Sequence, residues 1–133
     1  MSEEYLGKIY KDGEVIISQG EVGSDLYVIQ EGQVEVFVET AGHEVRLAVV
    51  YEGDFVGEMA LLDKGVRSAT VRSLGESRVL TVDRKAFLKN FMSDTTLAFR
   101  IMETMSHRIR KLDTEVVLLK EEIARVKEIV EVL

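Results

Sequence analysis

One segment of the sequence combines residue types that could hold an anion. It covers residues 55–70 and reads FVGEMALLDKGVRSAT. Glu58 stands inside an apolar run, where a buried carboxylate is costly unless it has partners. Nine residues later comes Arg67, whose planar guanidinium can pair with a phosphate, and Ser68 adds a hydroxyl beside it. The spacing alone leaves two interpretations open: an anion site, or a structural ion pair between Glu58 and Arg67.

The main chain of this segment could also contribute to an anion site. Gly57 allows a close approach between the main chain and a ligand, because glycine has no side chain. Residues 58–62 could form one helical turn, whose first N–H groups have no partner inside the helix. In such a site the amides and the guanidinium would hold a phosphate, while Glu58 could accept a hydrogen bond from a sugar hydroxyl.

Short strands surround the segment. All 10 glycines lie at or before Gly75, at intervals close to the turn rhythm of all-β domains. Valines alternate with polar residues from Gln33 to Glu39, which is typical of a half-buried strand. Tight turns are expected at Glu31-Gly32 and around Gly42. At least six strands are predicted, which favours a barrel or jelly roll: 14–18, 26–30, 33–39, 45–51, 68–73 and 77–82.

From Asp83 onward the pattern changes to helix. Asp83 is a suitable N-cap for a helix from Arg84 to Phe91, and Ser93 or Asp94 for a second helix that meets no glycine or proline up to the last residue. Apolar residues follow a heptad spacing in that second helix. The a positions are Met102, Ile109, Val116, Ile123 and Val130, and the d positions are Met105, Leu112, Leu119, Val126 and Leu133.

This heptad pattern predicts a parallel two-stranded coiled coil that makes the chain a homodimer. β-Branched residues fall mostly at a and leucines at d, as such coils prefer. The g and e positions of two parallel copies would form attractive pairs: Arg108 with Asp113, Glu115 with Lys120, and Glu122 with Lys127. The alternative is that the stripe packs on another protein or on a further domain. The expected division is a β domain with one helix in residues 1–92 and a dimerisation helix in residues 93–133.

Composition excludes several classes of function. The 133 residues include no cysteine, so disulfides and thiolate metal sites are ruled out, and with two histidines a zinc or iron site is not expected. A net charge of −7 argues against a surface for nucleic acid or anionic membrane. The longest apolar run, Leu47 to Tyr51, cannot span a bilayer, so a cytoplasmic protein is expected. We find no nucleophile with a base at motif spacing, and an enzyme is therefore not expected.

The segment resembles the phosphate-binding cassette of cyclic-nucleotide-binding domains, the family of catabolite activator proteins and of cyclic-AMP-dependent kinase regulatory subunits. The family pattern is Gly-Glu-(Leu/Ile/Met)-Ala-Leu, followed by an arginine and small residues. Matching positions are Gly57, Glu58, Met59, Ala60, Leu61, Arg67, Ser68, Ala69 and Thr70. The resemblance extends from about Lys11 to Leu112. Val66 stands where the family often has proline, which loosens the loop without removing a ligand group.

The resemblance implies a mainly β fold with C-terminal helices: an eight-stranded β-roll of the jelly-roll type, a short cassette helix, a B helix and a long C helix. It implies cyclic AMP or cyclic GMP as ligand, with Glu58 on the ribose 2′-hydroxyl and Arg67 on the exocyclic phosphate oxygens. Around these two, the expected ligand-binding residues are Val56, Gly57, Met59, Ala60, Ser68 and Ala69 from the cassette, and Leu112, Asp113 and Thr114 from the C helix.

The sequence thus predicts a cyclic-nucleotide-binding regulatory domain, with cyclic AMP the favoured ligand, that signals through a dimeric helix. Two alternatives remain. The chain could be the sensor part of an activator-type transcription regulator, although no helix-turn-helix follows Leu112 and this chain alone is not expected to bind DNA. It could also be a ligand-free docking module. The output partner is not identified by any motif. Solvated surface positions are expected for His43, His107, Glu31, Glu35, Glu39 and Glu44.

Overall fold

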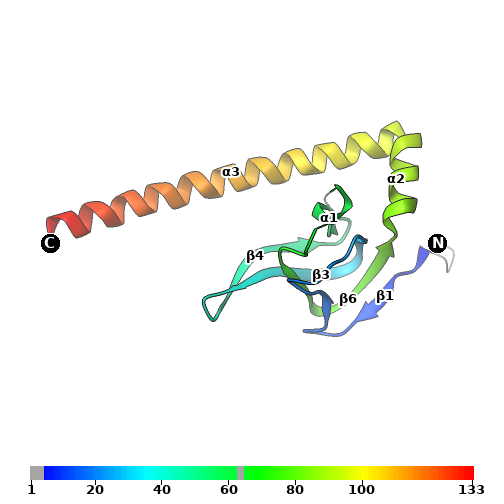
Figure 1. Cartoon of the computed structure of the whole chain (residues 1–133), viewed down its shortest axis with the longest axis horizontal. Helices are drawn as coiled ribbons and strands as arrows, with labels where there is room; N and C mark the ends of the chain where they lie inside the picture. The colour runs from blue at the N-terminus through cyan, green and yellow to red at the C-terminus, as the bar shows by residue number, and fades with distance from the viewer. Residues whose placement is uncertain (1–4, 63–64) are drawn as a thin grey trace. The chain divides into compact units, whose positions relative to one another are not determined.

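The computed structural model describes residues 5–62 and 65–133 (Figure 1). It forms two compact units, the first ending at Lys89 and the second beginning at Asn90. The first unit holds the β-sheet and the cassette, and the second consists of helix. No helix in these described ranges is long and apolar enough to cross a membrane.

The first unit is built on one antiparallel sheet with two long central strands. The path of the sheet is β1-β6-β3-β4, with β2 paired to β6 and β5 paired to β3. In Figure 1, β3 and β4 form a long hairpin. The strands are β1 (Lys8–Tyr10), β2 (Val15–Ile17), β3 (Leu26–Thr40), β4 (His43–Tyr51), β5 (Phe55–Val56) and β6 (Thr70–Val82).

The described residues therefore contain six strands in an open path, not the eight that the family resemblance implies. The expected turn at Glu31-Gly32 is wrong: β3 runs through it, and β6 runs in the same way through Gly75. The pairing of the two strands jumps from Glu31↔Arg78 to Gln33↔Leu74, so the glycines accommodate bulges inside continuous strands. Dividing both strands at these bulges would give eight segments.

Gly32 shows why a glycine is needed at such a bulge. Its φ is +81°, in the left-handed region, and an added Cβ would lie 2.6 Å from the Glu76 carbonyl oxygen. The two strands approach too closely there for any side chain. A turn and a bulge both require a positive φ, so the glycine by itself could not tell them apart.

The core of the first unit is made largely of branched aliphatic side chains from the strands. Ile29, Val34 and Val79 are fully buried there. Two serines share this interior, with their hydroxyl oxygens 2.6 Å apart, because Ser73 and Ser77 face each other across the bulge of β6. The hydroxyl of Ser73 also lies 2.6 Å from the Gly75 carbonyl oxygen, so these buried polar groups are satisfied within the bulge.

The helices begin where the caps predict. The cassette helix α1 spans Met59–Leu62, and α2 spans Arg84–Ser93, directly after Asp83. Helix α3 (Thr95–Val132) is capped by Asp94, whose carboxylate accepts a hydrogen bond from the Leu97 amide at 3.1 Å. With 38 residues, α3 is about 57 Å long and forms one unbroken rod (Figure 1).

Glu35 corrects an expectation drawn from the sequence. It was expected on a solvated strand face, but its side chain is only 8% exposed and lies between two arginines. Arg46 donates to one carboxylate oxygen at 2.7 Å and Arg72 to the other at 2.9 Å. Arg72 also pairs with Glu44 at 2.8 Å and stacks on the Phe37 ring. These contacts join β3, β4 and β6 on one face.

The arginines hold the pKa of the Glu35 carboxyl below its usual value. The hydrogen bond from Arg46 is the largest cause; burial opposes it, and Arg72 adds to it. A carboxyl whose pKa is lower in the folded state than in the unfolded state stabilises the fold above its unfolded pKa. This contribution is lost as the pH falls from the usual Glu value of about 4.5 through the lower folded pKa.

We therefore expect Glu35→Gln to lower the free energy of unfolding by about 1–2 kcal/mol at pH 7, because the arginines lose a charged acceptor. The difference from wild type should shrink below pH 4. Urea unfolding at a series of pH values measures it. Glu39→Gln, which alters an exposed carboxylate on the same strand, is the control. A difference independent of pH would contradict the assignment.

Candidate ligand-binding site

The cassette lies between the end of β5 and the start of β6. Val56 ends β5, and Gly57 then takes a φ of +90°, which turns the chain into the first turn of α1. Ala60 donates its amide to the Gly57 carbonyl at 3.3 Å. Residues 63 and 64 of the predicted segment lie outside the described residues. The chain continues from Gly65 to the arginine and enters β6 at Thr70.

The guanidinium of Arg67 is buried and fixed by main-chain oxygens. The residue is 8% exposed. One terminal nitrogen donates to the Gly57 carbonyl at 3.3 Å and the other to the Asp25 carbonyl at 2.9 Å. An added Cβ on Gly23 would lie 2.9 Å from Nε, so the guanidinium packs directly on that glycine's main chain. Contacts from two separate parts of the chain, Gly57 and residues 23–25, thus define the position of the charge.

The hydrogen bonds described for the Arg67 guanidinium go to main-chain carbonyls and not to Glu58. Among the described residues, the hydrogen-bond partners of the Arg67 guanidinium are carbonyls and include no carboxylate. A buried charge is costly when only dipoles compensate it. Within the described residues, two of its roughly five N–H donors bond to these carbonyls, and a guanidinium can also donate to an anion.

The main chain of Arg67 is also held, by the segment that precedes β3. The Gly20 amide donates to the Arg67 carbonyl at 2.9 Å, and the Arg67 amide donates to the Glu21 carbonyl at 2.7 Å. A single bridge pairs Val22 with Val66. The sequence interpretation did not include these neighbours in the site. Gly20 and Gly23, two glycines before a strand, were the available signal, because glycine permits close backbone approach.

Tyr27 adds an aromatic face to the site. The centre of the Arg67 guanidinium lies 5.9 Å from the centre of its ring, within the range of a cation–π contact. Burial is the main cause that raises the pKa of the Tyr27 hydroxyl; the charge of Asp25 adds to the rise and Arg67 opposes it. The hydroxyl therefore remains protonated at neutral pH.

The other predicted cassette residues differ in their burial. Val56 and Ala60 are buried and anchor both ends of the Gly57 turn in the core. Met59 is 67% exposed, Ser68 is exposed, and Glu58 and Ala69 are half-buried. The structure thus brings Gly57 and Arg67 into direct contact and leaves Met59 and Ser68 accessible to solvent.

The predicted helix residues lie in the second unit. Leu112, Asp113 and Thr114 are exposed on α3, and the Thr114 hydroxyl donates to the Arg110 carbonyl at 3.1 Å, within the helix. Their role in binding stays a prediction. In the part of the chain that the structure describes, no group of three or more acidic or histidine side chains is placed to hold a metal ion.

Comparison with known proteins identifies the family. The family model "Cyclic nucleotide-binding domain" matches residues 8–94, which include the whole sheet and the cassette. The chain belongs to this family, as the cassette motif indicates. The expected family resemblance is confirmed.

Among its relatives are a bacterial receptor and a kinase subunit. The chain is 33% identical to the cyclic AMP receptor protein of Thermus thermophilus over 89% of this chain and 55% of that protein. It is 37% identical to the cAMP-dependent protein kinase regulatory subunit of Dictyostelium discoideum, over 77% of this chain and 32% of the subunit. The crystal structure of the Thermus thermophilus catabolite activator protein matches with a TM-score of 0.75 and 31% identity, over 88% of this chain and 56% of that one. The chain thus spans about half or less of these relatives.

The contact between Gly23 and Arg67 can be tested directly. Gly23→Ala places a methyl group against the guanidinium without requiring a positive φ. We expect displacement of the side chain from the Asp25 carbonyl and a loss of about 1–3 kcal/mol in the free energy of unfolding. A crystal structure of the variant and urea unfolding measure the two effects. Ser24→Ala is the neighbouring control, and equal behaviour of the two variants would argue against the tight contact.

Proposed function

We propose that this chain is a cyclic-nucleotide-binding regulatory domain whose favoured ligand is cyclic AMP. The observation that carries the proposal is the buried guanidinium of Arg67, which has main-chain carbonyl partners and no carboxylate partner among the described residues. An anion would compensate its charge and accept its remaining hydrogen bonds. A cyclic mononucleotide supplies one phosphate with one negative charge, and this matches one arginine.

The cassette offers further groups for such a ligand. We propose that Arg67 pairs with the exocyclic phosphate oxygens, that the main chain at the start of α1 adds donors, and that Ser68 contributes its hydroxyl. Glu58 would accept a hydrogen bond from the ribose 2′-hydroxyl. Support comes from the exposure of Ser68 and the half-buried position of Glu58, both in the segment that contains Arg67. Val56 and Ala60 would position the cassette from below.

The names of the relatives favour cyclic AMP over cyclic GMP. The bacterial receptor and the kinase subunit are both named for cyclic AMP. Selection of the base is assigned to α3, where Leu112, Asp113 and Thr114 are the predicted contacts. In this proposal, the base biases the position of α3, and that shift is the regulatory signal.

We further propose that α3 forms a parallel homodimer. No residue of α3 is buried, and its apolar a and d side chains from Ile109 to Val130 are 48–62% exposed. So long a row of exposed aliphatic side chains is unusual on a monomer, and a second copy of the same helix would cover it. A coil of this kind would carry a shift of α3 toward an output partner.

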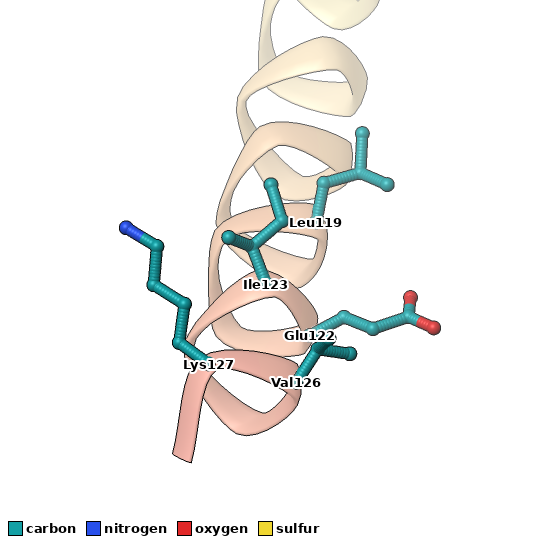
Figure 2. A pocket seen from close by; sticks show the side chains of 5 residues that line it. All are labelled: Leu119, Glu122, Ile123, Val126 and Lys127. Carbon is teal, nitrogen blue, oxygen red and sulfur yellow. The ribbon is translucent and has the colours of Figure 1, made fainter. Parts of the chain in front are cut away.

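The charges beside the stripe favour this pairing. Around a shallow hollow of about 250 Å³, Leu119, Ile123 and Val126 form the apolar row, and Glu122 and Lys127 flank it on opposite sides (Figure 2). In a parallel pair, Glu122 of one copy would face Lys127 of the other. Each exposed pair of this type adds at most about 1 kcal/mol and mainly selects the register.

Arg67→Ala tests the binding site. We expect cyclic AMP affinity to fall roughly 30-fold to several thousand-fold, which corresponds to about 2–5 kcal/mol, because the phosphate charge loses its partner. Calorimetric titration of wild type and variant measures the change. Arg125→Ala, at an exposed helix position, should bind as wild type does.

The same titration decides the proposal and the identity of the ligand. The wild-type protein is titrated with cyclic AMP, cyclic GMP and a cyclic dinucleotide, and binding of each is measured by calorimetry and by thermal shift. Absence of binding to both mononucleotides at millimolar concentration would reject the sensor function. It would favour a ligand-free dimerisation or docking module.

Ile123→Lys tests the dimer. A lysine at an a position places two charges inside the apolar seam, so we expect dissociation to a monomer of 15.0 kDa. Sedimentation velocity measures the mass. Ala124→Lys adds the same charge one residue further on, outside the stripe, and should remain dimeric. A monomeric wild type at tens of micromolar would exclude the homodimer.

A further inference from the structure

We propose that Gln19 is a positioning residue for the phosphate-binding arginine, an inference that rests on the proposed function. Gln19 begins a segment, residues 19–25, that we call the clamp segment. This segment contacts both the main chain and the side chain of Arg67. Gln19 fastens the beginning of the segment to the sheet, so that the guanidinium is held in place before any ligand arrives.

The clamp segment determines where the arginine can be. Its Gly20 amide and Glu21 carbonyl pair with the main chain of Arg67 at 2.9 and 2.7 Å. Its Asp25 carbonyl accepts from the guanidinium at 2.9 Å. The segment lies between β2 and β3, and apart from the single bridge at Val22 it belongs to no strand. Its shape therefore depends on individual hydrogen bonds.

Gln19 supplies three of these bonds. Its side-chain oxygen accepts from the Glu39 amide at 2.8 Å, and its side-chain nitrogen donates to the Glu39 carbonyl at 3.4 Å. The side chain thus binds the main chain of β3 as a neighbouring strand would. The Gln19 amide also donates to the Thr70 hydroxyl at 3.0 Å, at the start of β6. One residue thereby joins the clamp segment to two strands of the sheet.

The bonds of the Gln19 side chain matter because of where they lie along the clamp segment. The clamp segment is continuous with β3 at its far end, where Leu26 is buried, so that end is fixed. At its near end, the side chain of Gln19 supplies the bonds to β3. Without the side-chain amide, residues 19–21 lose their bonds to β3, while the Gln19 main-chain amide still bonds to Thr70 and β2 still pairs with β6. The segment that pairs with the main chain of Arg67 is then held less firmly, and the phosphate would meet a less preorganised arginine.

The chain contains a matched control at Gln30. Its side-chain amide makes the same pair of bonds: it accepts from the Gly7 amide at 2.7 Å and donates to the Tyr5 carbonyl. These bonds fasten the N-terminal segment, which does not contact Arg67 in the described structure. Gln30→Ala therefore removes the same chemistry at a different place. A general loss of stability would affect both variants, whereas loss of positioning would affect only Gln19.

The experiment compares Gln19→Ala, Gln19→Glu and Gln30→Ala with wild type in the full chain. We expect Gln19→Ala to weaken cyclic AMP binding roughly 3- to 10-fold, which is the net effect of about one hydrogen bond. Gln19→Glu keeps the acceptor for the Glu39 amide, so its affinity for cyclic AMP should lie between those of wild type and Gln19→Ala. Gln30→Ala should bind as wild type. In free protein, the NMR signal of the Arg67 Nε–H should shift toward its solvent-exposed position in Gln19→Ala alone.

The outcomes separate this inference from the proposed function. Wild-type affinity in Gln19→Ala, or an equal loss in Gln19→Ala and Gln30→Ala, would overturn the positioning role. If wild type binds neither cyclic AMP nor cyclic GMP, the proposed function fails, and the Arg67 signal in the free protein still decides the role of Gln19. An unchanged signal in Gln19→Ala would reject it.

Discussion

The site is built around one buried charge, the Arg67 guanidinium, whose hydrogen-bond partners among the described residues are main-chain carbonyls. Carbonyls of Gly57 and Asp25 hold it from two sides, and Gly23 leaves it the space it occupies. A buried cation whose partners are dipoles costs stability, and in the proposed function an anion bound at this site would recover that energy. Under the proposed function, the stability of the fold and the affinity for the ligand would be linked through this one side chain. Gly23 and Gly57 have no side chain, and this lets the main chain approach the guanidinium closely.

The sequence identified the cassette motif but not the scaffold around it. Glu58, Arg67 and the small residues after it form a local motif, so they could be recognised directly. Asp25 contributes only a carbonyl oxygen, which every residue type has, and no pattern of side chains could identify it. Gln19 lies 48 positions from Arg67, as their numbers show. Its role depends on strand pairing that becomes visible only in three dimensions.

The fold shows a similar division. Asp94 acts on the residues that directly follow it, because its carboxylate caps the first turn of α3, so the start of this helix could be predicted. The predicted turn at Gly32 was wrong, because a positive φ serves a bulge as well as a turn, and the partner strand decides between them. Glu35 was assigned to solvent by strand alternation. That assignment failed because Arg46 and Arg72 come from two other strands and cover the carboxylate.

The carbonyl of Gly57 has a consequence for how binding could be observed. It accepts two hydrogen bonds at 3.3 Å, one from the Ala60 amide in α1 and one from the Arg67 guanidinium. The first turn of the helix and the charge of the site thus share one acceptor atom. Any movement of the guanidinium alters the competition for that oxygen. The rate of hydrogen exchange at the buried Ala60 amide should therefore report the position of the Arg67 guanidinium without any added label.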